Sequence, residues 1–556
     1  METLRDVLPL ITHDCFLASI DLKHAYFSVP VCREDRSWLK FPWNGVIWQF
    51  TCLPQGFSSS PRLFTKLLKV PFSHFRALGI LTTIYIDDCL VIADSREKLL
   101  TDVMYIVTTL DHLGFTINLD KSELQPSHKI AFLGFVLNSS DMTIKLTPSK
   151  ADKIRTLGLQ LLRQRDIRIR DLAMFIGNVV AAGESVKHAP LKYKYLEILR
   201  NDALTQNCGD YEAVLHLDER AKSLIHWWTT NIHSCVRSLS TPGPDLFITT
   251  DASMTGWGAS TGDAITGGHW ADYEKEHINV LELKAVLFGL KTLFRDVTNK
   301  HIRIKSDNTT AVASINNCGS IKRHLMGVSE AIFEWAHNKN VDLSAEYILG
   351  SLNVTADLAS REKDFNKEWR LMPTVFNDIC RLYGAPNIDL FASRINTQLA
   401  LFYSWKPDPE ALGTNAFSFD WNTTSALYAF PPFRVVKDVL QKLREEKASL
   451  LAILPLWRTQ PWFAEALRLL QGAPRLLPRK CLYLPQEPQR AHPIKNLQLA
   501  VWPLSGNPSA GREFRKGLQT FYSKPGTRKL LRHMGGISKS GTSFVYENRL
   551  IHFLPL

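Results

Sequence analysis

The distribution of apolar residues near the N-terminus predicts two strands that end in acidic side chains. Residues 81–93 (LTTIYIDDCLVIA) are apolar around one acidic pair, Asp87 and Asp88, which predicts a β-hairpin with the pair at its turn. Upstream, the apolar run in LASIDLKHAYFSVPV reaches Asp21. Adjacent carboxylates at a turn are commonly just solvated. Here the apolar flanks predict a largely buried hairpin, in which like charges need a cation between them.

Helical periodicity dominates the stretches between and after these strands. Leu-Pro-Gln-Gly predicts a turn, and Pro61 then begins an amphipathic helix. Over residues 147–240, apolar residues recur at i, i+3 and i+4, which predicts a helical region. The sequence TPGP at 241–244 marks a domain boundary.

Beyond this boundary, four acids follow alternating strands and helices. Asp251 ends an apolar strand before a glycine-rich turn, and Glu282 lies near the start of an apolar helix. Asp307 ends another strand, and Asp357 falls on a further helix. Each acid alone could be a cap, a first-turn residue favoured by the helix dipole, or a surface charge. Only their joint order is informative.

A third region again alternates strand and helix patterns. Asp389 lies at one strand end, and Pro431-Pro432-Phe433 lies at another. In open α/β sheets, ligands bind at the carboxyl ends of strands. The Pro-Pro-Phe sequence could equally be a turn with a packed aromatic side chain.

The positive charge of the chain is concentrated in its last segment. The net charge is +12, from 66 Lys and Arg against 54 Asp and Glu, and residues 475–556 hold 14 and 3 of these, respectively. This segment also contains proline-rich and glycine-rich pieces, so we expect it to be largely extended and flexible. Its charge could bind a phosphate backbone without sequence preference, or could simply keep the chain in solution.

Cysteine use and hydropathy exclude several classes of protein. The nine cysteines are scattered singly, with no CxxC pair and no His/Cys cluster, so we expect neither a disulfide framework nor a zinc site. No apolar run is long enough to span a membrane, and the N-terminus lacks a signal-peptide layout. We therefore expect an intracellular protein of the cytoplasm, the nucleus or both, with no membrane partner.

The acidic strand ends, taken in order with the Leu-Pro-Gln-Gly turn, resemble the motifs of retroelement reverse transcriptases. The resemblance implies a right-hand polymerase fold whose palm carries Asp21, Asp87 and Asp88. These carboxylates would hold two Mg²⁺ ions, which activate the primer hydroxyl and stabilise the departing pyrophosphate. Hard oxygen ligands are those that Mg²⁺ prefers.

The same resemblance assigns roles around the incoming nucleotide. Tyr26 matches the steric gate that excludes a ribose 2′-hydroxyl, which predicts the use of dNTPs. Gln55 and Phe57 match positions that line the nucleotide, and Lys121 matches a lysine that protonates pyrophosphate. Phe132-Leu133-Gly134 resembles the hairpin that grips the primer.

Residues 245–362 resemble the ribonuclease H fold. The resemblance implies a second site with two Mg²⁺ ions, which hydrolyses the RNA strand of an RNA–DNA hybrid and has all four acids as ligands. The loop before Asp357 lacks the histidine of many relatives, so cleavage is expected to be slower or to use another group. Gly256-x-Gly258 does not predict dinucleotide binding, because a third glycine and a following helix are missing.

The third region resembles the adenine-methyltransferase-like domain of DIRS-type retrotransposons. The resemblance admits S-adenosylmethionine as a cofactor and implies a tyrosine recombinase, encoded elsewhere in the element, as a partner. In adenine methylases an Asn or Asp before Pro-Pro-aromatic accepts a hydrogen bond from the base. Phe430 stands at that place here, and no glycine-rich cofactor loop is present.

We therefore predict a multidomain α/β and α+β protein of a retrotransposon, which is both an RNA-directed DNA polymerase (a nucleotidyltransferase) and a ribonuclease H (an endonuclease). Its partners would be an RNA template, a DNA primer, the RNA–DNA hybrid and dNTPs. The expected parts are a palm with partial fingers, a helical thumb and connection, a ribonuclease H fold, a small methyltransferase-like domain and a basic flexible tail, at 1–146, 147–240, 245–362, 374–474 and 475–556.

Two alternatives stay open at this stage. The chain begins shortly before Asp21, so we expect most of the fingers to be missing and the start to be an internal methionine of a longer reading frame. The product could then be a decayed one that binds RNA or hybrids without polymerising. An RNA-templated RNA polymerase is the other alternative, which Tyr26 and the ribonuclease H pattern oppose.

Overall fold

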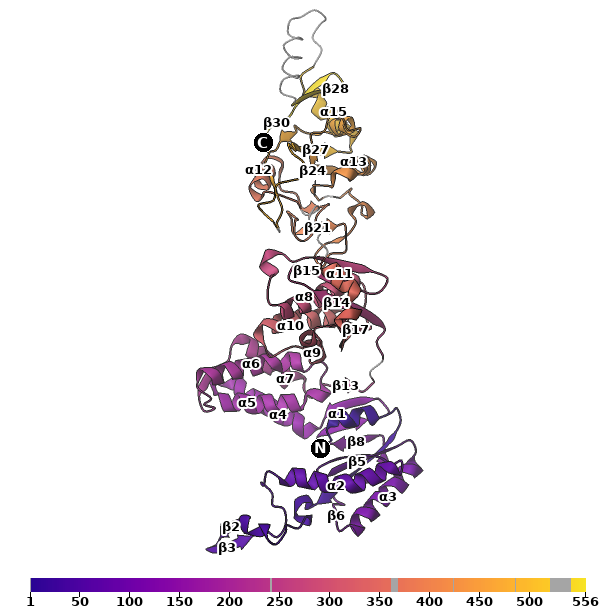
Figure 1. The fold of residues 1–556 in the computed structure, drawn as a ribbon, viewed down its shortest axis with the longest axis vertical. Coiled ribbons are helices and arrows are strands. Elements are labelled where there is room, and N and C mark those ends of the chain that lie inside the picture. Colours follow the sequence, from indigo (N-terminus) through magenta and orange to yellow (C-terminus); the bar gives the residue numbers. More distant parts are fainter. Residues whose placement is uncertain (1, 241–242, 362–368, 424, 486, 521–541) are drawn as a thin grey trace, which may run out of the picture. The chain divides into compact units, whose positions relative to one another are not determined.

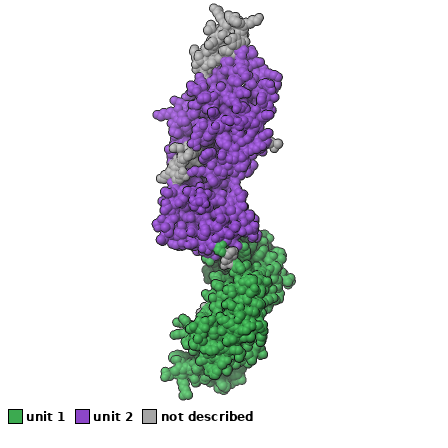
Figure 2. Space-filling view, turned by 90° about the vertical axis from the view of Figure 1, so that its right-hand side faces the viewer, with its two compact units in different colours: residues 1–243, 317–323 green, residues 244–316, 324–556 purple. Residues whose placement is uncertain are grey.

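The computed structural model forms two compact units (Figures 1 and 2). The first comprises residues 1–243 and 317–323, and the second comprises 244–316 and 324–556. The division falls within the expected TPGP boundary, of which Thr241 and Pro242 lie outside the described residues. The described residues are 2–240, 243–361, 369–423, 425–485, 487–520 and 542–556. No helix within these ranges is long and apolar enough to cross a membrane.

A mainly antiparallel sheet with two covering helices forms the first part of unit 1. Its strand order is β4-β5-β1-β6, and β7 also pairs with β1. Helices α2 and α3 bury Phe64, Phe72, Leu99 and Ile106 in the same core as the sheet. The bounds are β1 Phe16–Lys23, α2 Ser60–Ala77, β4 Leu81–Tyr85, β5 Asp88–Ala93, α3 Arg96–His112, β6 Thr116–Ile117 and β7 Glu123–Ser127.

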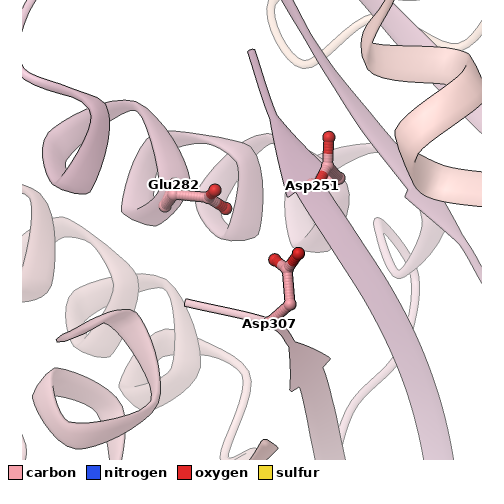
Figure 3. A group of neighbouring side chains, drawn as sticks. All are labelled: Asp251, Glu282 and Asp307. Carbon is pink, nitrogen blue, oxygen red and sulfur yellow. The ribbon is translucent and has the colours of Figure 1, made fainter. Parts of the chain in front are cut away.

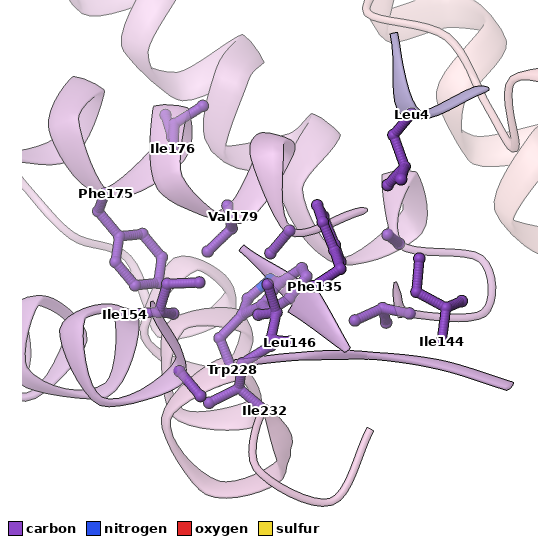
Figure 4. Close-up of a cluster of buried hydrophobic side chains, with 14 of the residues drawn as sticks. Leu4, Phe135, Ile144, Leu146, Ile154, Phe175, Ile176, Val179, Trp228 and Ile232 are labelled. Atoms are coloured by element: carbon purple, nitrogen blue, oxygen red, sulfur yellow. The ribbon is translucent and has the colours of Figure 1, made fainter. Parts of the chain in front are cut away.

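A small sheet and a helical region follow in unit 1, and the helices agree with the periodicity of residues 147–240. The sheet has the order β13-β10-β9-β8 and shares one core with the helices that follow β10 in this unit (Figure 4). Phe175 and Trp228 are among its fully buried side chains, and Phe135 is 5% exposed. The bounds are β8 Lys129–Phe132, β9 Phe135–Asn138, β10 Thr143–Leu146, α4 Pro148–Arg163, β11 Asp166–Arg168, α5 Ile169–Ala181, α6 Pro190–Gln206, β12 Val214–His216, α7 Glu219–Asn231 and β13 Arg237–Ser238.

Two further elements of unit 1 lie outside these sheets. Helix α1 (Leu4–Val7) contributes Leu4 and Val7 to the core of the helical region. Strands β2 (Lys40–Trp43) and β3 (Val46–Gln49) form a separate hairpin, all of whose residues are exposed. The side chain of Trp43 remains 64% exposed.

Unit 2 begins with a five-stranded mixed sheet of order β16-β15-β14-β17-β18. Strands β16 and β14 both run antiparallel to β15 between them, whereas β17 runs parallel to β14 and β18 runs parallel to β17. The bounds are β14 Leu246–Ala252, β15 Gly256–Ser260, β16 Ile265–His269, α8 Ile278–Leu293, β17 His301–Ser306, α9 Thr309–Asn316, α10 Arg323–Asn338, β18 Asp342–Tyr347 and α11 Val354–Ser360.

The glycines at 256 and 258 permit close packing of α11 on β15. A Cβ at Gly258 would lie 2.2 Å from the carbonyl oxygen of Ala356, and one at Gly256 would lie 2.8 Å from that of Ser360. No side chain other than hydrogen fits between the strand and the helix. The Gly-x-Gly pattern therefore has a packing role.

The rest of unit 2 is built on an eight-stranded sheet of order β22-β21-β20-β23-β24-β27-β25-β30. Strands β20 to β24 are parallel to their neighbours, and β27 runs antiparallel between β24 and β25. The bounds are α12 Pro373–Tyr383, β20 Ile388–Asp389, β21 Leu401–Ser404, β22 Gly413–Thr414, β23 Leu427–Ala429, α13 Val436–Glu445, β24 Ser449–Pro455, α14 Phe463–Arg468, β25 Arg475–Leu476, β27 Leu499–Ser505, α15 Pro508–Lys516 and β30 Leu554–Pro555.

The expected flexible tail at 475–556 needs correction for its described residues. Strand β27 pairs with β24 over its whole length, and all seven of its residues are buried. Proline and glycine on either side of LAVWPLS led to the prediction of an extended tail, but the apolar run itself supplies a strand to the sheet. Pairs β19–β26 (Arg370–Leu371, Leu482–Tyr483) and β28–β29 (Ser543–Tyr546, Arg549–His552) add further paired segments. The part of the tail at 521–541 lies outside the described residues.

Candidate active sites

The three acids near the N-terminus lie at one end of the first sheet, on adjacent strands and in the turn between two of them. Strands β1 and β5 pair so that Asp21 lies opposite Asp88. The β4–β5 hairpin closes between Tyr85 and Asp88, which leaves Asp87 in its turn. The carbonyl of Asp87 accepts a hydrogen bond from the backbone N–H of Leu22 at 3.0 Å, which ties the turn to β1. The expected hairpin and strand end therefore bring the acids to adjacent strands.

The turn itself has a strained backbone. Ile86 adopts a φ of 56°, in the left-handed region that β-branched residues rarely enter. Such a conformation costs about 1–3 kcal/mol and persists only where surrounding structure imposes it. Pairing of β4 and β5 on one side and of β5 with β1 on the other imposes it here.

Burial raises the pKa of both turn carboxyls. Asp88 has its pKa raised to about 6, first by desolvation and then by the charges of Asp87 and Asp21, while Lys121 acts in the opposite direction. The pKa of Asp87 is raised first by desolvation and further by the charge of Asp21. A cluster of carboxylates that raise each other's pKa favours a bound cation, because the cation removes their repulsion.

The loop that carries Lys121 is tied to the acidic strand. The hydroxyl of Ser122 accepts from the backbone N–H of Asp21 at 2.9 Å and donates to the carbonyl of Asn118 at 2.7 Å. The backbone N–H of Asn118 donates to the carbonyl of Asp21 at 2.8 Å. Lys121 is thereby close enough for its charge to oppose the rise in the pKa of both turn carboxyls.

The residues expected around the nucleotide have different surroundings. Tyr26 packs edge-on against Phe64 at 5.6 Å between ring centroids, and the charge of Asp87 contributes, after burial, to raising its phenol pKa. Gln55 and Phe57 are exposed in the loop before α2. The hydroxyl of Ser60 closes this loop by donating to the carbonyl of Pro54 at 2.8 Å. Tyr26 is therefore beside the acids, and Gln55 and Phe57 are in open surroundings.

The hairpin that resembles a primer grip has a tight two-residue turn. Leu133 and Gly134 both have positive φ, of 50° and 79°, between paired Phe132 and Phe135. This pattern matches a type I′ turn, which favours glycine. The Lys150 ammonium donates to the carbonyl of Leu133 at 2.8 Å, and a Cβ at Gly134 would lie 2.1 Å from the same side chain. Lys150 thus stabilises the turn by a hydrogen bond to its backbone.

Three of the four acids expected in unit 2 form one cluster (Figure 3). Asp251 on β14, Glu282 on α8 and Asp307 after β17 each offer a carboxylate oxygen, and these oxygens lie within 4.8 Å of one another. Burial, followed by the charges of Asp251 and Asp307, raises the pKa of Glu282 to about 8. Within the described residues, this is the cluster whose spacing fits a metal ion, and its all-oxygen donors suit Mg²⁺.

The fourth acid, Asp357, lies on α11 but outside this cluster. Its carboxylate accepts from the guanidinium of Arg361, one helical turn later, at 2.6 Å. It is near enough to Asp251 to contribute to that residue's raised pKa. The structure therefore places Asp357 beside the cluster with a basic partner of its own.

Two polar residues that sequence patterns did not single out hold Asp251 in place. The hydroxyl of Ser360 donates to the Asp251 carboxylate at 2.6 Å, and the amide of Asn353 donates to its other oxygen at 3.4 Å and to the carbonyl of Thr250 at 3.0 Å. Both lie on or next to α11, more than a hundred residues from Asp251. Only the Asn-x-x-x-Asp-x-x-Ser spacing around Asp357 could have pointed to them.

The acid of the third region, Asp389, is buried at the end of β20. Its carboxylate accepts only long hydrogen bonds, of 3.3 Å, from the backbone N–H groups of Phe391 and Gln398. Burial raises its pKa to about 7. The adjoining cavity is about 10 Å³, which is space for roughly one water molecule. Its lining includes Trp369 and Tyr428.

These residues do not fit S-adenosylmethionine. The cavity is too small for a nucleoside, and the loop after Asp389 folds over the carboxylate instead of leaving a glycine-lined cradle. Pro431 is buried, Pro432 is exposed, and the ring of Phe433 packs on Trp457 at 4.9 Å. This geometry is that of a turn with a packed aromatic side chain.

Comparison with known proteins finds a family match for the N-terminal region. Residues 2–137 match the profile of the family described as "Reverse transcriptase (RNA-dependent DNA polymerase)". The chain is 27% identical over 225 residues to the Gag-Pro-Pol polyprotein of bovine leukemia virus (isolate Australian), covering 38% of this chain and 14% of that protein. It is 31% identical over 153 residues to the Gag-Pro-Pol polyprotein of human T-cell leukemia virus 2, covering 26% and 10%.

Among solved structures, a foamy viral protease-reverse transcriptase in complex with an RNA/DNA hybrid is 17% identical, with a TM-score of 0.36, over 66% of this chain and 49% of that one. The chain spans only about a tenth of the length of the polyproteins named above. Residues 2–137 are therefore similar to the reverse transcriptase domain found in retroviral Pol polyproteins.

Proposed function

We propose that this chain is an RNA-directed DNA polymerase with ribonuclease H activity, which copies retrotransposon RNA into DNA and degrades the RNA strand of the hybrid. The observation that carries the proposal is the register of β1 and β5, which sets Asp21 opposite Asp88 inside the segment that matches reverse transcriptases. Carboxylates at adjacent strand ends can supply the oxygen ligands of a two-metal phosphoryl-transfer site.

In the polymerase site, Asp21 and Asp87 are the main Mg²⁺ ligands and Asp88 supports them. Mg²⁺, when bound, supplies charge that activates the primer hydroxyl and stabilises pyrophosphate. Lys121, beside the turn acids, is placed to give a proton to the leaving group. Tyr26 closes the space that a 2′-hydroxyl would need, and Gln55 and Phe57 line the approach of the dNTP.

In the ribonuclease H site, Asp251, Glu282 and Asp307 hold the metal ions, and Asp357 completes the set. The raised pKa of Glu282 supports a cation there, because a bound cation compensates the repulsion between the buried carboxylates. Ser360 and Asn353 orient Asp251 by hydrogen bonds. The substrate is the RNA strand of the hybrid that the first site produces.

We further propose that the element is of the DIRS type, with a tyrosine recombinase encoded elsewhere as a partner. Support comes from the order of the three regions and from the third sheet, in which parallel strands on both sides of β20 are followed by the antiparallel strand β27. The third region is methyltransferase-like in this proposal, and the small volume of the cavity beside Asp389 argues against methyl transfer.

Primer extension on an RNA template with dNTPs and Mg²⁺ tests the polymerase proposal. Asp87→Asn should abolish extension, since it removes one charge from the metal site but little volume. Asp111→Asn, on the exposed face of α3, is the matched control and should extend normally. Equal extension by the Asp87→Asn protein and the unmodified chain would refute the assignment.

A further inference from the structure

The loop that follows β20 contacts the proposed ribonuclease H fold through a buried ion pair within unit 2. The guanidinium of Arg394 forms an ion pair with Glu274, and their side chains are only 3% and 8% exposed. Arg394 also donates to the carbonyl of His269 at 2.8 Å, and its guanidinium lies 4.8 Å from the ring centroid of Phe288. A desolvated charge needs such partners, so this contact is not an incidental surface pair.

Three more hydrogen bonds join the following residues of the same segment to the proposed ribonuclease H fold. The guanidinium of Arg295 donates to the carbonyls of Ala411 and Leu412 at 2.6 and 2.9 Å. The hydroxyl of Thr266 donates to the carbonyl of Pro407 at 2.8 Å. Residues 394–412 therefore bind the ribonuclease H fold through side chains of both partners, and we call this segment the brace.

The contacted residues lie around α8, the helix that carries Glu282. Glu274 precedes the helix, Phe288 lies on it, and Arg295 follows its end. The ammonium of Lys284, on α8, donates to the carbonyl of Glu274 at 3.1 Å. The brace thus contacts residues before, within and after α8, and these residues lie on both sides of Glu282 in the sequence.

We propose that the third region of the chain serves as a positioning element for α8, in place of cofactor chemistry. In an α/β sheet that binds a nucleotide, the loop after a central strand faces the ligand. Here that loop closes over Asp389 and directs Arg394 into the ribonuclease H fold. Arg394 is a positioning residue, since it acts on Glu282 only through the helix. The inference rests on the proposed function for the role of Glu282, but not for the contact itself.

Hydrogen exchange of the full chain tests the brace without any need for activity. Arg394→Met should accelerate exchange over residues 278–293 by roughly tenfold or more, because local opening of α8 no longer breaks the buried contact. Arg394→Lys keeps the positive charge but loses the planar set of donors of the guanidinium, so it should restore part of the protection from exchange. Arg381→Met removes an exposed pair on α12 and should change nothing there. Residues 96–112 of α3 serve as an internal reference.

A second variant covers the case in which Arg394→Met does not fold. Arg295→Met leaves no unpaired buried charge and should accelerate exchange at the end of α8. Unchanged exchange over residues 278–293 in both variants would overturn the brace.

Cleavage of an RNA–DNA hybrid then tests the positioning of Glu282. Arg394→Met should raise the Mg²⁺ concentration for half-maximal cleavage severalfold and leave primer extension unchanged. Faster exchange with an unchanged Mg²⁺ requirement would overturn the positioning role. Absence of cleavage by the unmodified chain would refute the proposed ribonuclease H function, and the exchange result would still decide the brace.

Discussion

Gly258→Ala should damage the proposed ribonuclease H site through packing alone. A Cβ at this position would lie 2.2 Å from the carbonyl oxygen of Ala356 and 2.7 Å from the backbone nitrogen of Ser360. Both atoms belong to the backbone of α11, so no side chain can turn away. A normal contact distance of about 3.5 Å requires α11 to move by roughly 1 Å. Overpacking of this kind costs about 1–3 kcal/mol.

The displacement reaches the acids through α11. This helix carries Asp357 and also Ser360, whose hydroxyl donates to Asp251 at 2.6 Å. A misplacement of about 1 Å in a catalytic group lowers the rate by roughly a hundredfold. Hybrid cleavage should therefore fall by about that factor, while primer extension stays unchanged.

Gly327→Ala is the matched control, assayed in parallel by calorimetric unfolding and hybrid cleavage. Gly327 lies within α10 of the same fold, and a Cβ added there would meet no described heavy atom within 4 Å beyond the adjoining backbone of its own helix. Alanine there should be neutral or stabilise the fold by about 0.5–1 kcal/mol. If the Gly258→Ala protein has the unfolding temperature and the rate of hybrid cleavage of the unmodified chain, close packing of α11 on β15 does not position the site.

Three further predictions concern single side chains. Tyr26→Ala should admit rNTPs during primer extension, because the ring that fills the space of the 2′-hydroxyl is gone; continued strict selection of dNTPs would show that another residue is the gate. Ser360→Ala should lower hybrid cleavage by about tenfold or more and Ser360→Thr should recover part of it, and equal activity of all three would remove Ser360 from the site. Glu282 has its pKa raised from 4.5 to about 8 by burial, so the fold binds more protons than the unfolded chain between these values, and without Mg²⁺ its stability should fall as pH rises through this window. Mg²⁺ or Glu282→Gln should reduce that dependence in thermal unfolding, and Asp88 and Asp389 account for the part that remains. Identical profiles with and without Glu282→Gln would contradict the burial of this carboxyl.

Much of the candidate chemistry follows from local pattern. Asp87 and Asp88 interrupt an otherwise apolar hairpin, and Asp251 and Asp307 end apolar strands, so their placement requires only strand periodicity. Asn353 and Ser360 escaped prediction because their partner, Asp251, lies more than a hundred residues away in the sequence. No local pattern records such a pair.

The third region was harder to predict for related reasons. Strand β27 is apolar over its whole length but is flanked by proline and glycine, and only its pairing with β24 shows that it completes a sheet. The ion pair of Arg394 with Glu274 joins residues 120 positions apart. Its role depends on burial, and the sequence does not show whether a charged residue in a loop is buried.

The most direct test of the central claim, two separate active sites in one chain, is an assay that follows both strands at once. A labelled RNA template is copied with dNTPs and Mg²⁺, and DNA synthesis and RNA cleavage are measured together. We expect Asp87→Asn to lose synthesis but still cleave a preformed hybrid, and Asp307→Asn to synthesise DNA and leave the RNA intact. Loss of both activities in either variant, despite folded protein, would contradict two independent sites.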